Sequence, residues 1–166
     1  MRESQIRFIR QLGFPAAAAS DRLYGALMFQ PRIIGGLVAI GIFFQSAWLF
    51  LALSAVLWWS TLVPTRNLFD AFYSRFVARP RGSAAFGVAP APRLFTQTMA
   101  ATVTFVIAAL LVLGATKTAW ALEAMAMIAV GAAVFRDFCG AACVYHRVRG
   151  LMTRQRPLVT SAAHGC

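Results

Sequence analysis

The chain has 166 residues, of which 60% are hydrophobic and only 13% are charged. Soluble domains average roughly 45–50% apolar and about 25% charged residues, so this composition argues against a soluble protein and favours one integral membrane domain. The net charge of +11 would suit a nucleic-acid-binding protein. However, the basic residues are almost all arginines beside long apolar stretches, and no nucleic-acid-binding motif is present, so we expect no nucleic-acid partner.

Residues 1–30 form the first predicted segment, on the cytoplasmic side or at the interface. Ile6, Ile9 and Leu12 recur with helical spacing among arginines, and Ser4 is a candidate helix cap. This pattern predicts a short basic amphipathic helix on an anionic membrane surface, and a partly ordered tail is the alternative. The segment is too polar for a secretory signal peptide.

Residues 31–63 are predicted to form the first transmembrane hairpin. A single helix over the uncharged part would be about 46 Å long, far more than the roughly 30 Å hydrocarbon core requires. The polar pair at 45–46 is the expected turn, which gives helices at about 33–44 and 47–63.

The start of the first helix stays open at this stage. Pro31 suits the first helical position, but a helix from there is short for a full span. Either the helix begins earlier, near Leu27, with Arg32 extending toward the interface, or the hairpin is shallow. Gly35 and Ala39 offer a small-residue surface for close helix packing.

Residues 64–93 are predicted to be a basic cytoplasmic loop. Aromatic and apolar residues share one helical face within it, which indicates an interfacial helix at about 67–78. The remainder is rich in proline and glycine and is typical of a loop.

Residues 94–149 are predicted to form the second transmembrane hairpin. Residues 94–113 are uncharged and are the clearest span of the chain. The fourth span covers about 119–135, and its helix is expected to run on toward Cys143. Residues 150–166 are predicted to be a mobile tail.

The basic residues predict the orientation of these four spans. Every arginine falls on one side of the predicted bundle, and only Lys117 falls on the other. Since Lys and Arg accumulate in cytoplasmic loops, both termini are expected to lie in the cytoplasm.

Cys139 and Cys143 are the main candidates for chemistry. On one continuous helix their spacing would put both sulfurs on one face, with His146 one turn further. The pair is either packing residues of a small-residue helix, a redox or sulfur-handling thiol pair, or part of a metal site. Zinc needs four ligands, so a fourth would come from His164, Cys166 or a partner.

Three further polar residues are candidates. Glu123 is the one acid within an apolar stretch, and intramembrane acids are often functional, although one turn beyond Trp120 it could also reach the far interface. Arg136 and Asp137 are expected at the cytoplasmic interface, paired with lipid headgroups or neighbouring residues. No catalytic triad, phosphate loop, dinucleotide fingerprint or carboxylate pair is visible, which disfavours an autonomous enzyme.

Three stretches carry a family resemblance. Residues 92–95 (PRLF), a long hairpin and residues 133–145 (AVFRDFCGAACVY), together with residues 75–81 (RFVARPR), resemble a family of small bacterial membrane proteins, domain of unknown function 4395. The resemblance covers about residues 31–149. It implies four transmembrane helices, a location in the bacterial cytoplasmic (inner) membrane, and a cysteine pair at the end of the last helix. The family pair is usually Cys-x-x-Cys, so the pair here is one residue wider.

The leading functional hypothesis is a non-catalytic accessory subunit of a larger membrane complex, with the bilayer and other membrane subunits as partners. The alternative is a membrane thiol protein that handles redox or sulfur equivalents through Cys139 and Cys143. A small transporter centred on Glu123 is a third hypothesis. The sequence identifies no cofactor.

Overall fold

The computed structural model describes residues 2–15, 17, 19–63, 68–73, 75 and 89–153, and within these ranges the chain forms helices and no β-strand. This confirms the predicted all-α class. The helices are α1 (Glu3–Gln11), α2 (Asp21–Phe44), α3 (Ala47–Leu62), α4 (Leu68–Tyr73), α5 (Ala91–Val112), α6 (Thr116–Arg136) and α7 (Gly140–Thr153).

Helices α2 and α3 form the first hairpin, and their turn lies at the predicted residues. Gln45 ends α2 in the left-handed conformation, with φ of 47°. Ser46 then caps α3, because its hydroxyl accepts a hydrogen bond from the Leu49 backbone N–H. The polar pair thus satisfies backbone groups that the two helix ends leave without helical partners.

The first helix begins twelve residues before residue 33, so the prediction that Pro31 opens it is wrong. Its cap is Ser20, whose side chain accepts a hydrogen bond from the Leu23 backbone N–H at 3.2 Å. Pro31 lies inside α2. The structure thus supports the alternative in which the helix starts early and Arg32 is an exposed residue within it.

Helices α5 and α6 form the second hairpin. Pro90 is the N-cap of α5 and Pro92 lies in its first turn, where a missing backbone N–H costs least. The turn between the helices includes Gly114, with φ of 73°. Both helices agree with the predicted spans to within about three residues.

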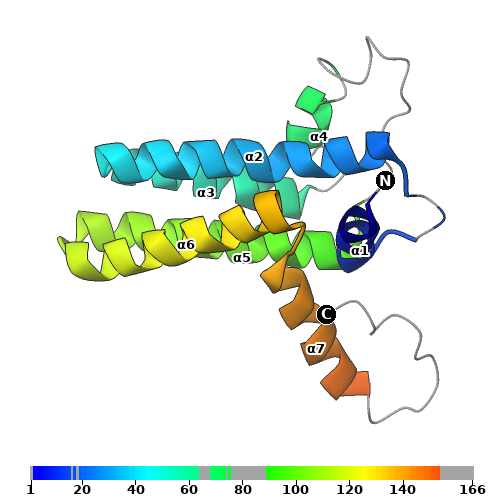
Figure 1. The fold of residues 1–166 in the computed structure, drawn as a ribbon. Helices are drawn as coiled ribbons and strands as arrows, with labels where there is room; N and C mark the ends of the chain where they lie inside the picture. Colours follow the sequence, from blue (N-terminus) through cyan, green and yellow to red (C-terminus); the bar gives the residue numbers. More distant parts are fainter. Residues whose placement is uncertain are drawn as a thin grey trace.

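The two hairpins lie side by side with both turns at one end, and α1, α4 and α7 lie at the other end (Figure 1). The main contacts between the hairpins join α3 to α5 and α2 to α6. Phe50, Leu57 and Ile107 are fully buried at the centre of the resulting core. The four long helices therefore pack as one bundle. The end opposite the hairpin turns carries the shorter helices and, with them, Arg7 and Arg10 of α1 and Arg149 of α7. It is the basic end of the bundle.

Three of the four bundle helices, α2, α5 and α6, are long and apolar enough to cross a membrane. Helix α3 has 16 residues, which corresponds to about 24 Å at 1.5 Å per residue and is shorter than the roughly 30 Å hydrocarbon core. Four spans are expected from the sequence, and three of the four helices have the length and composition of a membrane span.

Helix α1 confirms the predicted N-terminal amphipathic helix, but its apolar face packs against the protein. Phe8 and Ile9 are buried in a second cluster with residues of α2, α6 and α7. Ser4 is not the cap, since the N-cap is Arg2, whose backbone N–H donates to the Gln5 side chain.

The predicted continuous helix through Cys143 is wrong. Helix α6 ends at Arg136, and Asp137 takes the left-handed conformation with φ of 52°. Helix α7 starts at Gly140 and points away from the bundle (Figure 1).

Helix α4 coincides with the first half of the interfacial helix predicted at 67–78. The second half of that predicted helix, apart from Arg75, lies outside the described residues, and so does the predicted tail from residue 154 onward.

Candidate functional site

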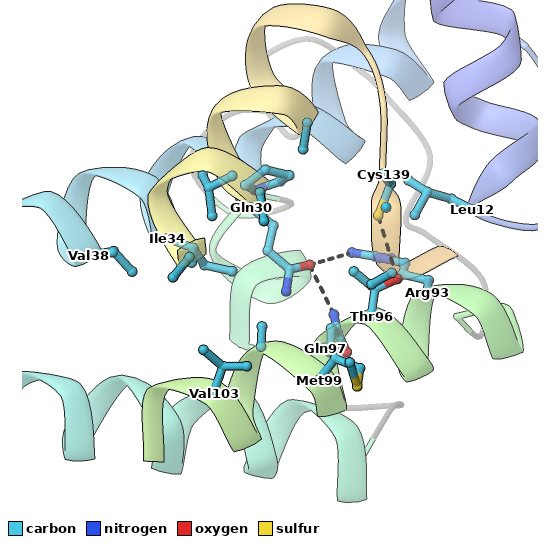
Figure 2. A pocket seen from close by; sticks show the side chains of 18 of the residues that line it. Leu12, Gln30, Ile34, Val38, Arg93, Thr96, Gln97, Met99, Val103 and Cys139 are labelled. Atoms are coloured by element: carbon cyan, nitrogen blue, oxygen red, sulfur yellow. Dashed lines mark hydrogen bonds between the residues drawn. The ribbon is translucent and has the colours of Figure 1, made fainter. Parts of the chain in front are cut away.

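A cavity of about 400 Å³ lies among α2, α5, α6 and α7, with α1 at its basic end. Its lining is mostly apolar and includes Ile34 and Val38 of α2 and Val103 of α5 (Figure 2). This volume is within the range of small-molecule sites, which are mostly apolar and carry few polar groups. The cavity is the candidate functional site.

Three buried polar side chains gather at the basic end of the cavity, as Figure 2 shows. The Gln30 side-chain oxygen accepts hydrogen bonds from Arg93 at 3.3 Å and from the Gln97 amide nitrogen at 3.0 Å. Arg93 is only 4% exposed and Gln97 only 3%. One amide oxygen thus joins α2 to α5 beside a buried positive charge.

The second polar atom of Gln97 is not satisfied. Its Oε1 is buried and has no hydrogen-bond partner among the described residues. A buried acceptor without a donor costs about 1–3 kcal/mol, so this oxygen is a candidate contact for a hydrogen-bond donor.

The sequence prediction did not select Gln30 or Arg93 as site residues. By sequence, Arg93 belongs to the predicted basic loop with other arginines, and Gln30 to the predicted segment before the first span. The one available signal was the four-residue spacing of Arg93 and Gln97, which puts both on one face of a helix.

Cys139 lies between α6 and α7 and lines the same cavity. It is a free, buried thiol, 3.8 Å from the Thr96 hydroxyl, and its backbone N–H donates to the Gln11 side chain. Cys143 lies within α7 and is disulfide-bonded. Because Cys139 is free, the two cysteines are not bonded to each other, and they do not share one helix as predicted.

His146 joins α7 to α1. Its Nε2 lies 3.0 Å from the backbone oxygen of Gln11, and since a carbonyl oxygen only accepts, Nε2 is the donor. Within the described ranges no group of three or more His, Cys, Asp or Glu side chains could hold a metal ion. His146 thus forms a hydrogen bond between two helices. The hypothesis of a metal site at Cys139, Cys143 and His146 gains no support from the described residues.

Asp137 is a structural junction. Its carboxylate accepts hydrogen bonds from the Ser4 hydroxyl of α1, at 2.8 Å, and from the Tyr24 hydroxyl of α2. Both partners belong to helices that are distant in the sequence, Ser4 by 133 residues and Tyr24 by 113. The neighbouring Arg136 is exposed.

Glu123 is buried near the hairpin turns, away from the cavity. One carboxylate oxygen accepts a hydrogen bond from the Gln45 amide at 3.0 Å, and Gln45 in turn accepts one from the Trp120 indole. The second oxygen is buried without a partner in the described part of the chain. Glu123 thus links the turn of the first hairpin to the second hairpin.

These features define a helical protein of membrane type with an internal apolar cavity. Residues 26–149 match the model of the family Domain of unknown function (DUF4395). The chain therefore belongs to this family, as its sequence motifs predicted. No curated protein and no solved structure gives a significant match.

Proposed function

We propose that this chain is a four-pass protein of the bacterial cytoplasmic membrane, with both termini in the cytoplasm, and acts as a non-catalytic accessory subunit of a larger membrane complex. Membership of a family of unknown function and three span-like helices support the general class. In this proposal α3 is the fourth span, because it is apolar and packs along the length of α5.

The observation that carries the accessory role is the uncovered apolar stripe of α7, formed by Val144, Val148, Leu151 and Met152, all exposed. Their spacing places them on one face of the helix. The first turns of α7 are fixed to the bundle through Tyr145, which packs against Phe95, and through His146. An anchored helix that presents an apolar stripe is suited to pack against another subunit.

The alternative, a thiol protein acting through Cys139 and Cys143, has no specific support. Reactive cysteines are accessible and lie in electropositive surroundings, whereas Cys139 is buried against Thr96.

The accessory role is tested by the mass and composition of the particle after extraction in mild detergent. We expect the chain in a large assembly, in fixed ratio with other membrane subunits. The double variant Leu151→Gln, Met152→Gln should reduce that fraction about tenfold or more, because it removes two apolar contacts of about 1 kcal/mol or more each.

The matched control is Arg147→Gln, which is exposed on α7 outside the stripe and should leave the assembly intact. A wild-type chain that elutes alone, or a double variant that remains fully assembled, would contradict the accessory role.

A further inference from the structure

The cavity described above has the length of one lipid chain. Along α5 it extends from Arg93 at the basic end to Thr104, which is roughly 16 Å at 1.5 Å per residue. This is close to half of the roughly 30 Å hydrocarbon core, the depth of one leaflet. With about 400 Å³, the cavity is at the small end of ligand sites, which suits one chain rather than two.

The mouth of the cavity is apolar. Three large apolar residues of its lining are themselves exposed: Met99 of α5 (41%), Met125 of α6 (54%) and Val144 of α7 (48%). The flexible side chains of methionine adapt to irregular apolar partners. Since α5 and α6 are apolar enough to span a membrane, an opening between them faces acyl chains rather than water.

The polar end of the cavity specifies a head group. Arg93 contributes a buried guanidinium, whose several N–H donors favour an anionic oxygen. The partnerless Oε1 of Gln97 needs a donor, such as a hydroxyl. The two side chains lie one helical turn apart, so one small head that carries both groups can contact both.

We propose that this cavity binds one single-chain lipid whose head carries an anionic phosphate and a free hydroxyl, as in a lysophospholipid. The phosphate contacts Arg93, the hydroxyl donates to Gln97, and the chain lies along Ile34, Val38 and Val103. The lipid enters sideways from the bilayer, past Met99 and Met125. This site does not depend on the accessory role.

The test measures binding by native mass spectrometry of the detergent-purified chain. The first probe is oleoyl-lysophosphatidylglycerol. The second is oleate, which is anionic but has neither the phosphate nor a hydroxyl, and the third is dioleoyl phosphatidylglycerol, which has two chains. We expect one lysophosphatidylglycerol per chain, with oleate and the two-chain lipid each at least about tenfold weaker.

Two variants locate the site. Val103→Phe fills the middle of the cavity and should reduce lysophosphatidylglycerol binding about tenfold or more. Val106→Phe is the matched control: Val106 is on the same helix, is partly exposed and is absent from the lining, so binding should be unchanged. Thermal unfolding of both variants verifies that they fold.

Gln97→Leu keeps a similar volume and removes the acceptor, together with the hydrogen bond that Gln97 donates to Gln30. It should reduce the preference for lysophosphatidylglycerol over oleate about tenfold, which corresponds to one buried hydrogen bond, and it serves also if Val103→Phe does not fold. Equal binding by Val103→Phe and Val106→Phe when both are folded, or an unchanged preference in Gln97→Leu, would overturn the proposal. Tighter binding of the two-chain lipid would overturn the single-chain assignment.

Discussion

Asp137 shows how a single residue determines the geometry of the basic end. Its left-handed backbone stops α6 and redirects the chain into α7. The same residue accepts hydrogen bonds from α1 and α2 through its carboxylate. Aspartate tolerates the left-handed conformation better than most residues, so one side chain supplies both the bend and its attachment.

Replacing Asp137 by glycine should separate these two roles. Glycine adopts the left-handed backbone without strain but loses both hydrogen bonds to Ser4 and Tyr24, so we expect the free energy of unfolding to fall by about 1–3 kcal/mol. Asp137→Asn keeps the backbone preference and one acceptor, and should lose less. Denaturant titration in micelles measures both variants, and hydrogen exchange of α1 should rise more in the glycine variant. Equal stability of the wild-type and glycine chains would contradict the junction role.

For individual residues such as Asp137 and Gln97, the sequence indicates the chemical type of the side chain but not its partners. Asp137 was expected at an interface, yet its partners Ser4 and Tyr24 are 133 and 113 residues away along the chain. Likewise, Gln30 and Gln97 are 67 residues apart. Periodicity describes one helix at a time, so it cannot indicate which polar side chains meet across a bundle.

At the scale of the helices, close packing of α2 on α6 depends on Gly35. A Cβ atom at this position would lie 2.8 Å from the Val130 Cγ1 atom, whereas a Cβ at Gly36 would meet nothing within 4 Å. The predicted small-residue surface is thus correct for Gly35, but Ala39 is exposed. Val130 is also one of the residues that line the cavity.

The adjacent glycines provide a matched pair of variants. Gly35→Ala should destabilise the chain by about 1–3 kcal/mol, because the added methyl group overpacks the α2–α6 contact. Gly36→Ala should be neutral or stabilising by up to about 1 kcal/mol, since alanine is the better helix former and its methyl enters open space. Thermal unfolding of both variants, compared with the wild type, shows whether each substitution lowers or raises the stability. A smaller loss for Gly35→Ala than for Gly36→Ala would show that the helices are further apart than described.

Across the whole molecule, the distribution of basic residues between the two ends of the bundle follows the helix topology. Both hairpin turns lie at one end, and α1, α4 and α7 lie at the other (Figure 1). Lys117 is at the turn end, while Arg2, Arg7, Arg10 and the described arginines of α7 lie at the opposite end. Since basic residues accumulate on the cytoplasmic side, this asymmetry supports the proposed orientation with both termini in the cytoplasm.

Cysteine labelling in intact cells should reveal that orientation. In a chain without its native cysteines, Lys117→Cys should react with a membrane-impermeant maleimide added outside. Arg10→Cys, which is also exposed, should react only after the cells are permeabilised. The opposite labelling pattern would invert the proposed topology.

The sequence by itself determined the all-helical class, the family, the turns of both hairpins and the segregation of basic residues. These properties follow from composition, period and turn chemistry, which are local. Only the tertiary structure decided that α2 starts at Asp21, that the chain bends at Asp137, and that Gln30, Arg93 and Gln97 meet at the end of a cavity. The start of α2 follows from the local Ser20 cap, which helical periodicity does not reveal. The other two depend on contacts between helices distant in the sequence. Neighbouring helices bury a charged arginine inside the bundle, and imperfect packing between the helices leaves the space beside it.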